Sequence, residues 1–304
     1  MYLLNILLIL FPILTILGED WGYEKVCVDG PNTWGGICKN GKNQSPVDIV
    51  SMTVTVPCLH FWMDNYNKHG DVEVKNTGHG VEISGFENWG DRPYIFYTEK
   101  NNVVNSSGNY LLTQIQFHWA TKSLNGSEHT VNGKHYAAEV QFVHRSERYT
   151  QEEAKKKPDG FAVLAVFLEL GRVGNSMANL EIPLQKIVKF GSKVNIKGFK
   201  IDFIFPEDEH MLLHIHRYKG SFTTPECNEA VNWIIFPESY QFTRRQVKLK
   251  DFHKKIFRNF FLQLNLLRAI EGPVSGKPLV SNVRPTQPLN GRKILTGNSD
   301  HCPP

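Results

Sequence analysis

Short, strand-like apolar runs recur along most of this chain, and they constrain its fold more than any other feature. Clusters of Gly, Asn and Pro separate these runs, as is typical of strands joined by turns. The runs are residues 72–76, 81–84, 94–97, 111–119, 136–144, 161–170, 211–216 and 231–236. Helical signals are confined to residues 176–190 and 242–267. We therefore expect a mainly β fold, with a large, mostly antiparallel sheet and short peripheral helices.

The chain has 304 residues, of which 41% are hydrophobic and 21% are charged, so it can bury a substantial core. No internal repeat or low-complexity linker divides it. This favours one domain over residues 19–298, followed by a short C-terminal tail over residues 299–304. The net charge of +4 is too small to indicate nucleic acid binding.

Residues 1–18 carry no charge and end at a small residue directly before Glu19 and Asp20. This pattern predicts a secretory signal peptide, although a basic N-terminal region is missing. An uncleaved membrane anchor is the alternative, but the segment is short for a span and Pro12 interrupts it. No second apolar run reaches spanning length. We therefore expect a secreted, extracellular protein that does not span a membrane.

The five cysteines lack the CxxC spacing of zinc sites, so in an oxidising compartment we expect them to form disulfides. Because five is an odd number, at least one thiol stays free or pairs with another chain. Asn105 and Asn125 begin glycosylation sequons in loop-like stretches, which predicts a glycoprotein. Asn43 begins a third and weaker sequon, because Pro46 follows it.

Two of the strand-like runs carry side chains in the arrangement of a metal pocket on a sheet. Successive side chains of a strand point to opposite faces, so Gln116 and His118 share one face of the first run. Glu139 and Gln141 likewise share one face of the second run. A zinc site of this kind would need histidines at positions 116, 118 and 141, and only His118 is present.

Longer motifs follow one another along nearly the whole chain. They are WGY at 21–23, NQSPVDI at 43–49, NTGHGVEISG at 76–85, QFHW at 116–119, GSEHTVNGKHYAAE at 126–139, DGFAVLAVFLELG at 159–171, YKGSFTTPECNEAVNW at 218–233 and RPTQPLNGR at 284–292. Together they resemble the α-class carbonic anhydrases. This resemblance implies a twisted, mainly antiparallel sheet of about ten strands, with a conical cleft that ends at zinc.

The resemblance also implies a chemistry, in which zinc-bound hydroxide attacks carbon dioxide and three imidazoles hold the metal. The family's ligand positions fall on Gln116, His118 and Gln141. An amide oxygen is a weak ligand for zinc. If each imidazole contributes about 3–4 kcal/mol, losing two weakens zinc binding by roughly 10⁴–10⁶-fold. We therefore expect the site to hold essentially no zinc.

Other histidines are poorly placed to replace the missing ligands. His144 is three residues from Gln141 and therefore faces the other side of its strand. The resemblance puts His129 in a structural hydrogen-bond network. His135 lies in a turn, too far along the chain to join the site.

Residues that match the rest of the family's catalytic apparatus are present. By resemblance, Glu128 and Thr223 are the pair that orients the zinc-bound hydroxide, and His79 is the proton shuttle. Glu139 matches the carboxylate that orients a ligand histidine. The residues that match the carbon dioxide pocket are Val143, Val163, Phe222, Thr224, Val231 and Trp233.

Without metal, these matching residues have a simpler interpretation as buried hydrogen bonds and core packing, so we expect them to be vestigial. Glutamine supplies both a donor and an acceptor. Gln116 and Gln141 can therefore close a metal-free hydrogen-bond network with Glu128 and Glu139.

By the same resemblance, Cys38 and Cys227 form the disulfide of secreted family members. This bond would close a loop of nearly the whole domain and stabilise the fold by a few kcal/mol. The pairing of Cys27, Cys58 and Cys302 stays open.

Between Pro237 and Asn282 the chain is longer than the family pattern by roughly 15 residues, and the basic segment 244–268 lies within this region. Apolar residues at three- and four-residue steps, from Leu249 to Leu267, predict a helix. Its basic residues, opposed only by Asp251, are Arg244, Arg245, Lys248, Lys250, Lys254, Lys255, Arg258 and Arg268. An ordinary solvated surface helix explains this pattern. The alternative is a docking face for an anionic partner, such as a sulfated glycan, an acidic protein or a lipid headgroup.

These observations favour a secreted protein similar to the inactive carbonic-anhydrase-related members of the family, without a cofactor and acting as a binding module. The alternative is a zinc-dependent carbonate dehydratase with an atypical metal site.

Overall fold

The computed structural model describes residues 21–23, 30–50, 54–55, 59–99, 108–169, 177–201, 204, 214–240, 264–274 and 276–298. Outside these residues lie the predicted signal peptide, Asn105, Cys27, Cys58, Cys302, the C-terminal tail and residues 244–263 of the basic segment. Among the described helices, none is long and apolar enough to cross a membrane.

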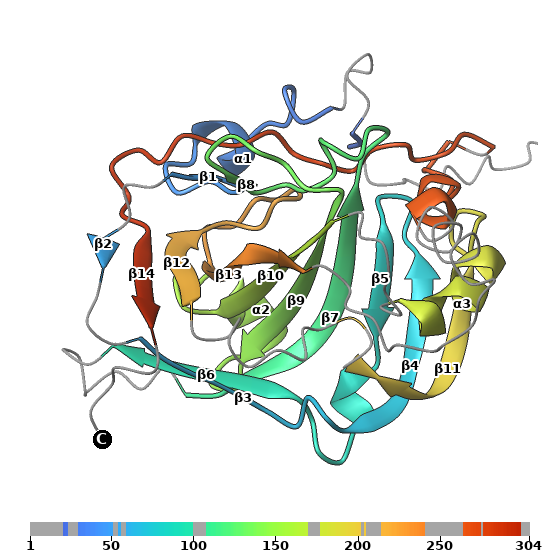
Figure 1. Ribbon diagram of the computed structural model, residues 1–304, viewed down its shortest axis with the longest axis horizontal. Helices are drawn as coiled ribbons and strands as arrows, with labels where there is room; N and C mark the ends of the chain where they lie inside the picture. Colours follow the sequence, from blue (N-terminus) through green and yellow to red (C-terminus); the bar gives the residue numbers. More distant parts are fainter. Residues whose placement is uncertain are drawn as a thin grey trace, which may run out of the picture.

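A large sheet forms the centre of the molecule. Its strands are β2 (Val54–Thr55), β3 (Leu59–Asp64), β4 (His69–Asn76), β5 (Val81–Ser84), β6 (Tyr94–Glu99), β7 (Tyr110–Trp119), β9 (Ala138–Ser146), β10 (Phe161–Leu168), β11 (Lys193–Lys200), β12 (His214–Gly220), β13 (Val231–Tyr240) and β14 (Leu295–Asn298). Their order is β11-β4-β5-β7-β9-β10-β13-β12-β14-β2, and β6 pairs with both β3 and β7. Figure 1 shows β4 and β11 on one side of the sheet and β12, β14 and β2 on the other.

Most neighbouring strands are antiparallel, whereas β10 pairs with β13, and β14 with β2, in parallel. The expected mainly β, mostly antiparallel fold is therefore confirmed. The described chain holds twelve strands in this sheet rather than about ten. The additional pairings involve short or polar strands such as β2 and β11, which have no apolar run to reveal them.

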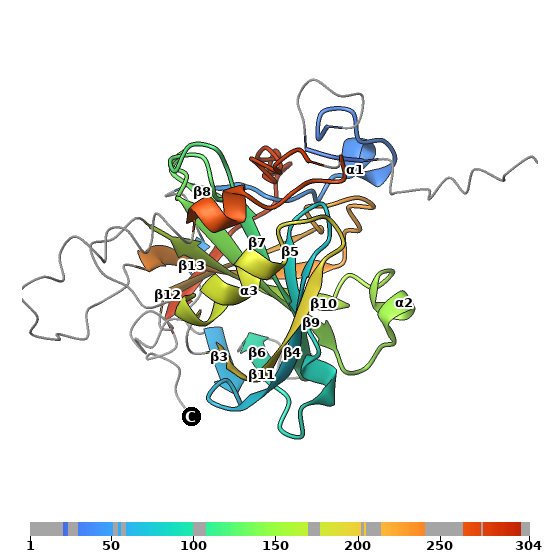
Figure 2. The ribbon, with the colours of Figure 1, turned by 90° about the vertical axis from the view of Figure 1, so that its right-hand side faces the viewer.

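The remaining elements are short and peripheral. They are the two-stranded sheet of β1 (Asp48–Ile49) and β8 (Thr130–Val131), the helices α1 (Ile37–Asn40), α2 (Gln151–Ala154) and α3 (Glu181–Lys186), and the 3-10 helices η1 (Phe86–Asn88) and η2 (Ala178–Leu180). Figure 2 shows α1 and α2 at the margins of the molecule. The predicted helix over 176–190 is shorter than expected, because Met177 takes a left-handed φ of 65° and a 3-10 turn follows it.

Residues 264–268 form the described end of the predicted basic helix. Leu264 and Leu267 are buried in the core, as the apolar stripe predicts. Arg268 donates hydrogen bonds to the Ala120 carbonyl (2.8 Å) and to Ser123 Oγ (3.3 Å), so this basic residue is used within the fold.

The core occupies both faces of the sheet. Every residue of β10 is buried, because β9 and β13 flank it and apolar side chains cover it on each side. Leu164 and Val166 belong to one core cluster, whereas Val163 and Ala165 belong to the other. Gln141 lies opposite Ala165 in the β9–β10 ladder, so it shares the face of Val163 and Ala165.

Candidate functional site

The predicted site residues come together where β7 pairs with β9. The register sets Gln116 directly opposite Gln141, and His118 directly opposite Glu139. Directly opposed residues of an antiparallel pair point to the same face. The three family ligand positions and Glu139 therefore share one face, as the alternation of the two runs predicts.

His118 is held in one orientation by the backbone. It is 2% exposed, and its Nδ1 donates to the Asn282 carbonyl oxygen at 2.8 Å. A carbonyl oxygen only accepts, so Nδ1 carries a proton. Nε2 lies 3.5 Å from Glu128 Oε2 and makes no hydrogen bond with any described residue. Nε2 is therefore the His118 ring nitrogen that no hydrogen bond from the described residues engages, and it faces the buried carboxylate of Glu128.

Gln141 presents its amide N–H groups, rather than a lone pair, to the neighbouring carboxylates. Its Nε2 donates to Glu128 Oε2 at 2.9 Å and to Glu139 Oε1 at 3.0 Å. A carboxylate oxygen accepts hydrogen bonds and does not donate them, so these two partners fix the orientation of the Gln141 amide. Gln116 makes a side-chain hydrogen bond with Glu82, whose pKa is raised mainly by burial.

Glu139 is the most heavily bonded carboxylate of the site. Its Oε2 accepts from the backbone N–H groups of Glu128 (2.9 Å) and His129 (2.8 Å), and its Oε1 accepts from His129 Nδ1 (2.9 Å). His129 Nε2 shares a hydrogen bond with the Tyr218 hydroxyl at 2.7 Å. Burial raises the pKa of Glu139, but His129 outweighs burial and the pKa falls to about 2. The predicted structural role of His129 is confirmed.

Glu128 is also fully buried, and both of its carboxylate oxygens have hydrogen-bond partners. It makes a side-chain hydrogen bond with Thr223, which confirms the predicted contact, and its Oε1 accepts from the Arg284 backbone N–H at 3.0 Å. Burial raises the pKa of Glu128, although the nearby His118 opposes this shift. The pair matches the family's arrangement around a metal-bound hydroxide, yet each contact also satisfies a buried polar group.

The residues predicted to line the carbon dioxide pocket lie in or against the packed core. Val143, Val163, Val231 and Trp233 are buried in one cluster, against which Phe222 packs from a half-buried position. Thr224 is half-buried beside Thr223. His79 is half-buried, and its ring stacks on Trp21 with centroids 3.8 Å apart and planes 12° apart.

Other histidines do not reach the ligand positions. His144 faces the opposite side of β9, where its Nε2 meets the Tyr66 hydroxyl at 2.5 Å. Burial lowers the pKa of His144 to about 3, so its ring is neutral. His135 Nδ1 donates to the Ser127 carbonyl at 2.8 Å. Both observations agree with the positions expected from the sequence.

Two residues that organise the site were not singled out by the sequence. Asn282 holds His118 through its carbonyl, and its side chain accepts from the Trp119 N–H (2.8 Å) and donates to the Phe117 carbonyl (2.8 Å). Arg284 is 1% exposed, and its guanidinium donates to the carbonyls of Ser45 (2.7 Å) and Cys38 (2.9 Å). No local pattern reveals these contacts, because they join segments more than 160 residues apart in sequence.

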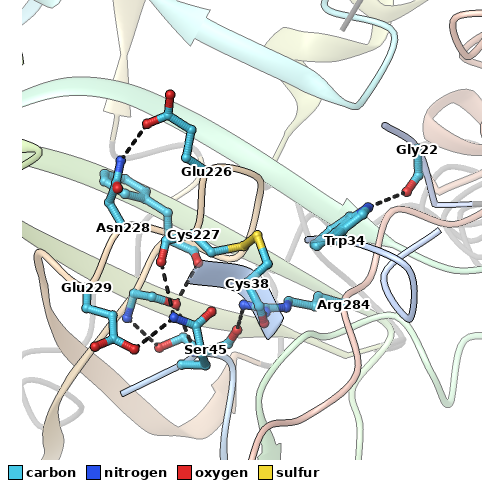
Figure 3. The surroundings of a disulfide bond; sticks show 12 residues. Gly22, Trp34, Cys38, Ser45, Glu226, Cys227, Asn228, Glu229 and Arg284 are labelled. Carbon is cyan, nitrogen blue, oxygen red and sulfur yellow. Dashed lines mark hydrogen bonds between the residues drawn. A yellow bond between two sulfur atoms is a disulfide. The ribbon is translucent and has the colours of Figure 1, made fainter. Parts of the chain in front are cut away.

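The expected disulfide joins Cys38 to Cys227 across a sequence separation of 189 residues. Figure 3 shows Arg284 beside Cys38, and Glu226 and Asn228 on the Cys227 side of the bond. The disulfide therefore ties α1 to the loop that carries Thr223. Asn125, the described glycosylation position, lies exposed in a turn.

Comparisons with known proteins agree with this fold. Residues 29–298 match the family model of eukaryotic-type carbonic anhydrase. The chain is 35% identical over 288 residues to “Putative carbonic anhydrase 5” of Caenorhabditis elegans, covering 91% of this chain and 82% of that protein. It is 32% identical over 282 residues to carbonic anhydrase 3 of Rattus norvegicus and over 285 residues to that of Homo sapiens, covering 91% of this chain and 98% of each. The chain belongs to the eukaryotic-type carbonic anhydrase family.

This family normally uses zinc, and the donor set at the three ligand positions does not fit that ion. His118 supplies one imidazole nitrogen, whereas Gln141 turns N–H groups toward Glu128 and Glu139. Zinc prefers nitrogen and sulfur lone pairs, which an amide N–H group does not offer. Within the described ranges, no three His, Cys, Asp or Glu side chains gather in an arrangement that could hold a metal.

Proposed function

We propose that this protein is a secreted carbonic-anhydrase-related protein with a degenerate zinc site, which does not hydrate carbon dioxide and acts as a binding module. One observation carries the proposal. Gln141, at a ligand position, donates from one amide nitrogen to two buried carboxylates at 2.9 and 3.0 Å.

The energetics of that network support a metal-free site. Zinc entry would require the Gln141 side chain to turn its oxygen inward, which breaks two hydrogen bonds to charged groups. Such bonds contribute about 1.5–3 kcal/mol each. Zinc binding by an amide oxygen offsets little of the free energy of these two hydrogen bonds. The metal-free, hydrogen-bonded site is therefore more stable than a zinc-bound site with the Gln141 amide turned inward.

The second candidate is a zinc-dependent carbonate dehydratase with an atypical metal site. Its support is the available Nε2 of His118, together with the hydrogen bond between Glu128 and Thr223. A metal with fewer protein ligands and more water would satisfy that nitrogen.

Metal content and activity measured on one preparation separate the two candidates. We expect purified protein dialysed against zinc to contain far less than one zinc per chain and to show no carbon dioxide hydration above buffer. An active family member treated in parallel is the positive control. Stoichiometric zinc, together with hydration that a sulfonamide inhibits, would overturn the proposal in favour of the dehydratase.

Secretion and glycosylation are parts of the same proposal. The uncharged residues 1–18 support secretion, and the exposed position of Asn125 suits a glycan. The basic segment 244–268 supports an anionic partner. If that segment docks such a partner, binding weakens steeply as salt rises.

A further inference from the structure

A hollow lies on the β12–β13–β14 part of the molecule, away from the family ligand positions. Its volume is about 430 Å³, within the range of small-molecule sites. Its walls are Asn43, Pro158, Arg217, Tyr218, Lys219, Gly220, Glu229, Asn232, Arg292, Lys293 and Leu295. The ladder registers bring its centre together, because Lys219 lies opposite Asn232 and Arg217 lies opposite Leu295.

The walls of this basic cavity are strongly positive. Four of the lining side chains are cations, namely Arg217, Lys219, Arg292 and Lys293, and Glu229 is the one carboxylate among them. Glu229 is already occupied, because it accepts from the Asn43 N–H (2.7 Å) and from Gln44 Nε2 (2.9 Å). These bonds outweigh its partial burial and lower the pKa of Glu229. The cavity thus favours an anion over a cation or a neutral molecule.

The four cations divide into a fixed pair and an available pair. Arg217 is 6% exposed, and its guanidinium lies 4.0 Å from the centre of the Tyr97 ring. Arg292 donates to the carbonyls of Lys219, Leu289 and Gln44 at 2.7–3.0 Å, which fixes that wall. Lys219 and Lys293 are exposed, and neither ammonium group makes an ion pair with any residue that the structure describes.

Asn232 adds an uncharged donor beside these cations. Its side chain is 5% exposed and lines the cavity from β13. Ammonium, guanidinium and amide N–H groups around one hollow are the donors that recognise a tetrahedral oxyanion. The apolar edge of Leu295 and the ring of Tyr218 leave room for an uncharged body attached to that anion.

We propose that the basic cavity binds the sulfate or phosphate ester group of a sugar-sized molecule. Lys219 and Lys293 contact the ester oxygens, while Arg217 and Arg292 supply a fixed positive wall. The site goes beyond the proposed loss of hydratase activity and does not depend on it, since none of its lining residues occupies a ligand position. An ordinary solvated basic surface is the competing explanation, and it predicts no saturation and no preference between lysines.

Titration calorimetry at low salt, with glucose 6-sulfate, glucose 6-phosphate and unmodified glucose as probes, tests the site. We expect both esters to bind saturably and glucose not to bind. The ester that binds more tightly shows whether the site prefers a sulfate or a phosphate group. Changing Lys219→Gln together with Lys293→Gln should weaken ester binding on the order of tenfold, since the two exposed charge pairs together contribute about 1.4 kcal/mol. Binding should also weaken as salt is added.

The matched control is Lys197→Gln with Lys200→Gln, which makes the same charge change on exposed residues of β11, at the other side of the sheet (Figure 1). This pair should change ester affinity less than about twofold. Equal weakening by both pairs would reduce the effect to net charge and overturn the proposal. Glucose binding as tightly as its esters would do the same, as would the absence of saturable binding by either ester to folded protein.

Discussion

The ligand positions and the polar residues directly behind them differ in how far they match the family pattern. At the ligand positions, two of three side chains are amides, namely Gln116 and Gln141. Directly behind them, Glu139 keeps His129 and the Glu128 N–H, as a working family member would need. The first set can hold amides without leaving these buried carboxylates unpaired, since Gln141 donates to both of them. The second set is retained because buried charges must be paired in any case.

This difference shows why matching catalytic motifs are poor evidence of activity. Glu128, Thr223 and Glu139 satisfy one another and the backbone without a metal. These residues therefore stabilise the fold whether or not a metal is bound. The ligand positions bear more directly on the capacity for zinc, since they supply the atoms that would bind the ion.

Restoring the ligands gives the largest expected effect. Gln116→His combined with Gln141→His should raise zinc affinity by roughly 10⁴–10⁶-fold and produce measurable carbon dioxide hydration. The physical reason is that Glu139 already lies 3.0 Å from the position 141 side chain, where it can accept a ring N–H and orient the new ligand. Metal analysis and a hydration assay measure the two outcomes.

The control for this reversion is Gln116→Asn with Gln141→Asn, which perturbs the same positions but keeps amides, and it should stay free of zinc. If the histidine variant folds normally and still binds no zinc, then the residues behind the ligand positions have lost their function too. The contrast between the two regions would then be wrong.

A smaller effect is expected from breaking the retained network. Glu139→Ala removes the acceptor for His129 and leaves a buried polar group unpaired, so it should lower the free energy of unfolding by about 3–5 kcal/mol. Gln116→Ala, at a half-buried ligand position, should cost less than about 1.5 kcal/mol, since it loses one hydrogen bond. Urea unfolding measures both values, and similar losses for the two variants would contradict the comparison.

Sequence reasoning predicted the parts of the molecule that depend on local pattern or on matching motifs. The run at 161–170 became β10 (Phe161–Leu168), because a buried central strand is apolar throughout. The run at 111–119 became β7, and its alternation placed Gln116 and His118 on one face. The edge strand β11 was missed, because it has no continuous apolar run and its pairing with β4 is distant in sequence.

The site shows the same division between local and distant information. The alternation of β7 and β9 was enough to bring the ligand positions together, but not to show that Gln141 bridges two carboxylates. The Gln141 bonds join side chains whose orientations the alternation does not specify, and the Asn282 carbonyl reaches His118 from 164 residues away in the sequence. A period-two pattern specifies which face a side chain occupies, and it carries no information about partners from elsewhere in the chain.

The last predicted effect is a pH dependence, and it concerns His144, the histidine on the opposite face of β9 from the ligand positions. Its folded-state pKa of about 3 is below its ordinary value of 6.5. Between these two pH values the unfolded chain binds a proton at His144 and the folded protein does not. Stability is therefore full above pH 6.5 and falls as the pH drops, by up to about 1.4 kcal/mol per pH unit. Between pH 7 and 5, the loss should be about 2 kcal/mol, and His144→Gln should remove it. This window isolates His144 from Glu139, whose stabilising ionisation is lost only as the pH falls below 4.5 toward 2. Urea unfolding of both proteins at pH 7 and 5 measures the difference. An equal loss of unfolding free energy in the variant and the parent would show that burial of the His144 ring does not cause it.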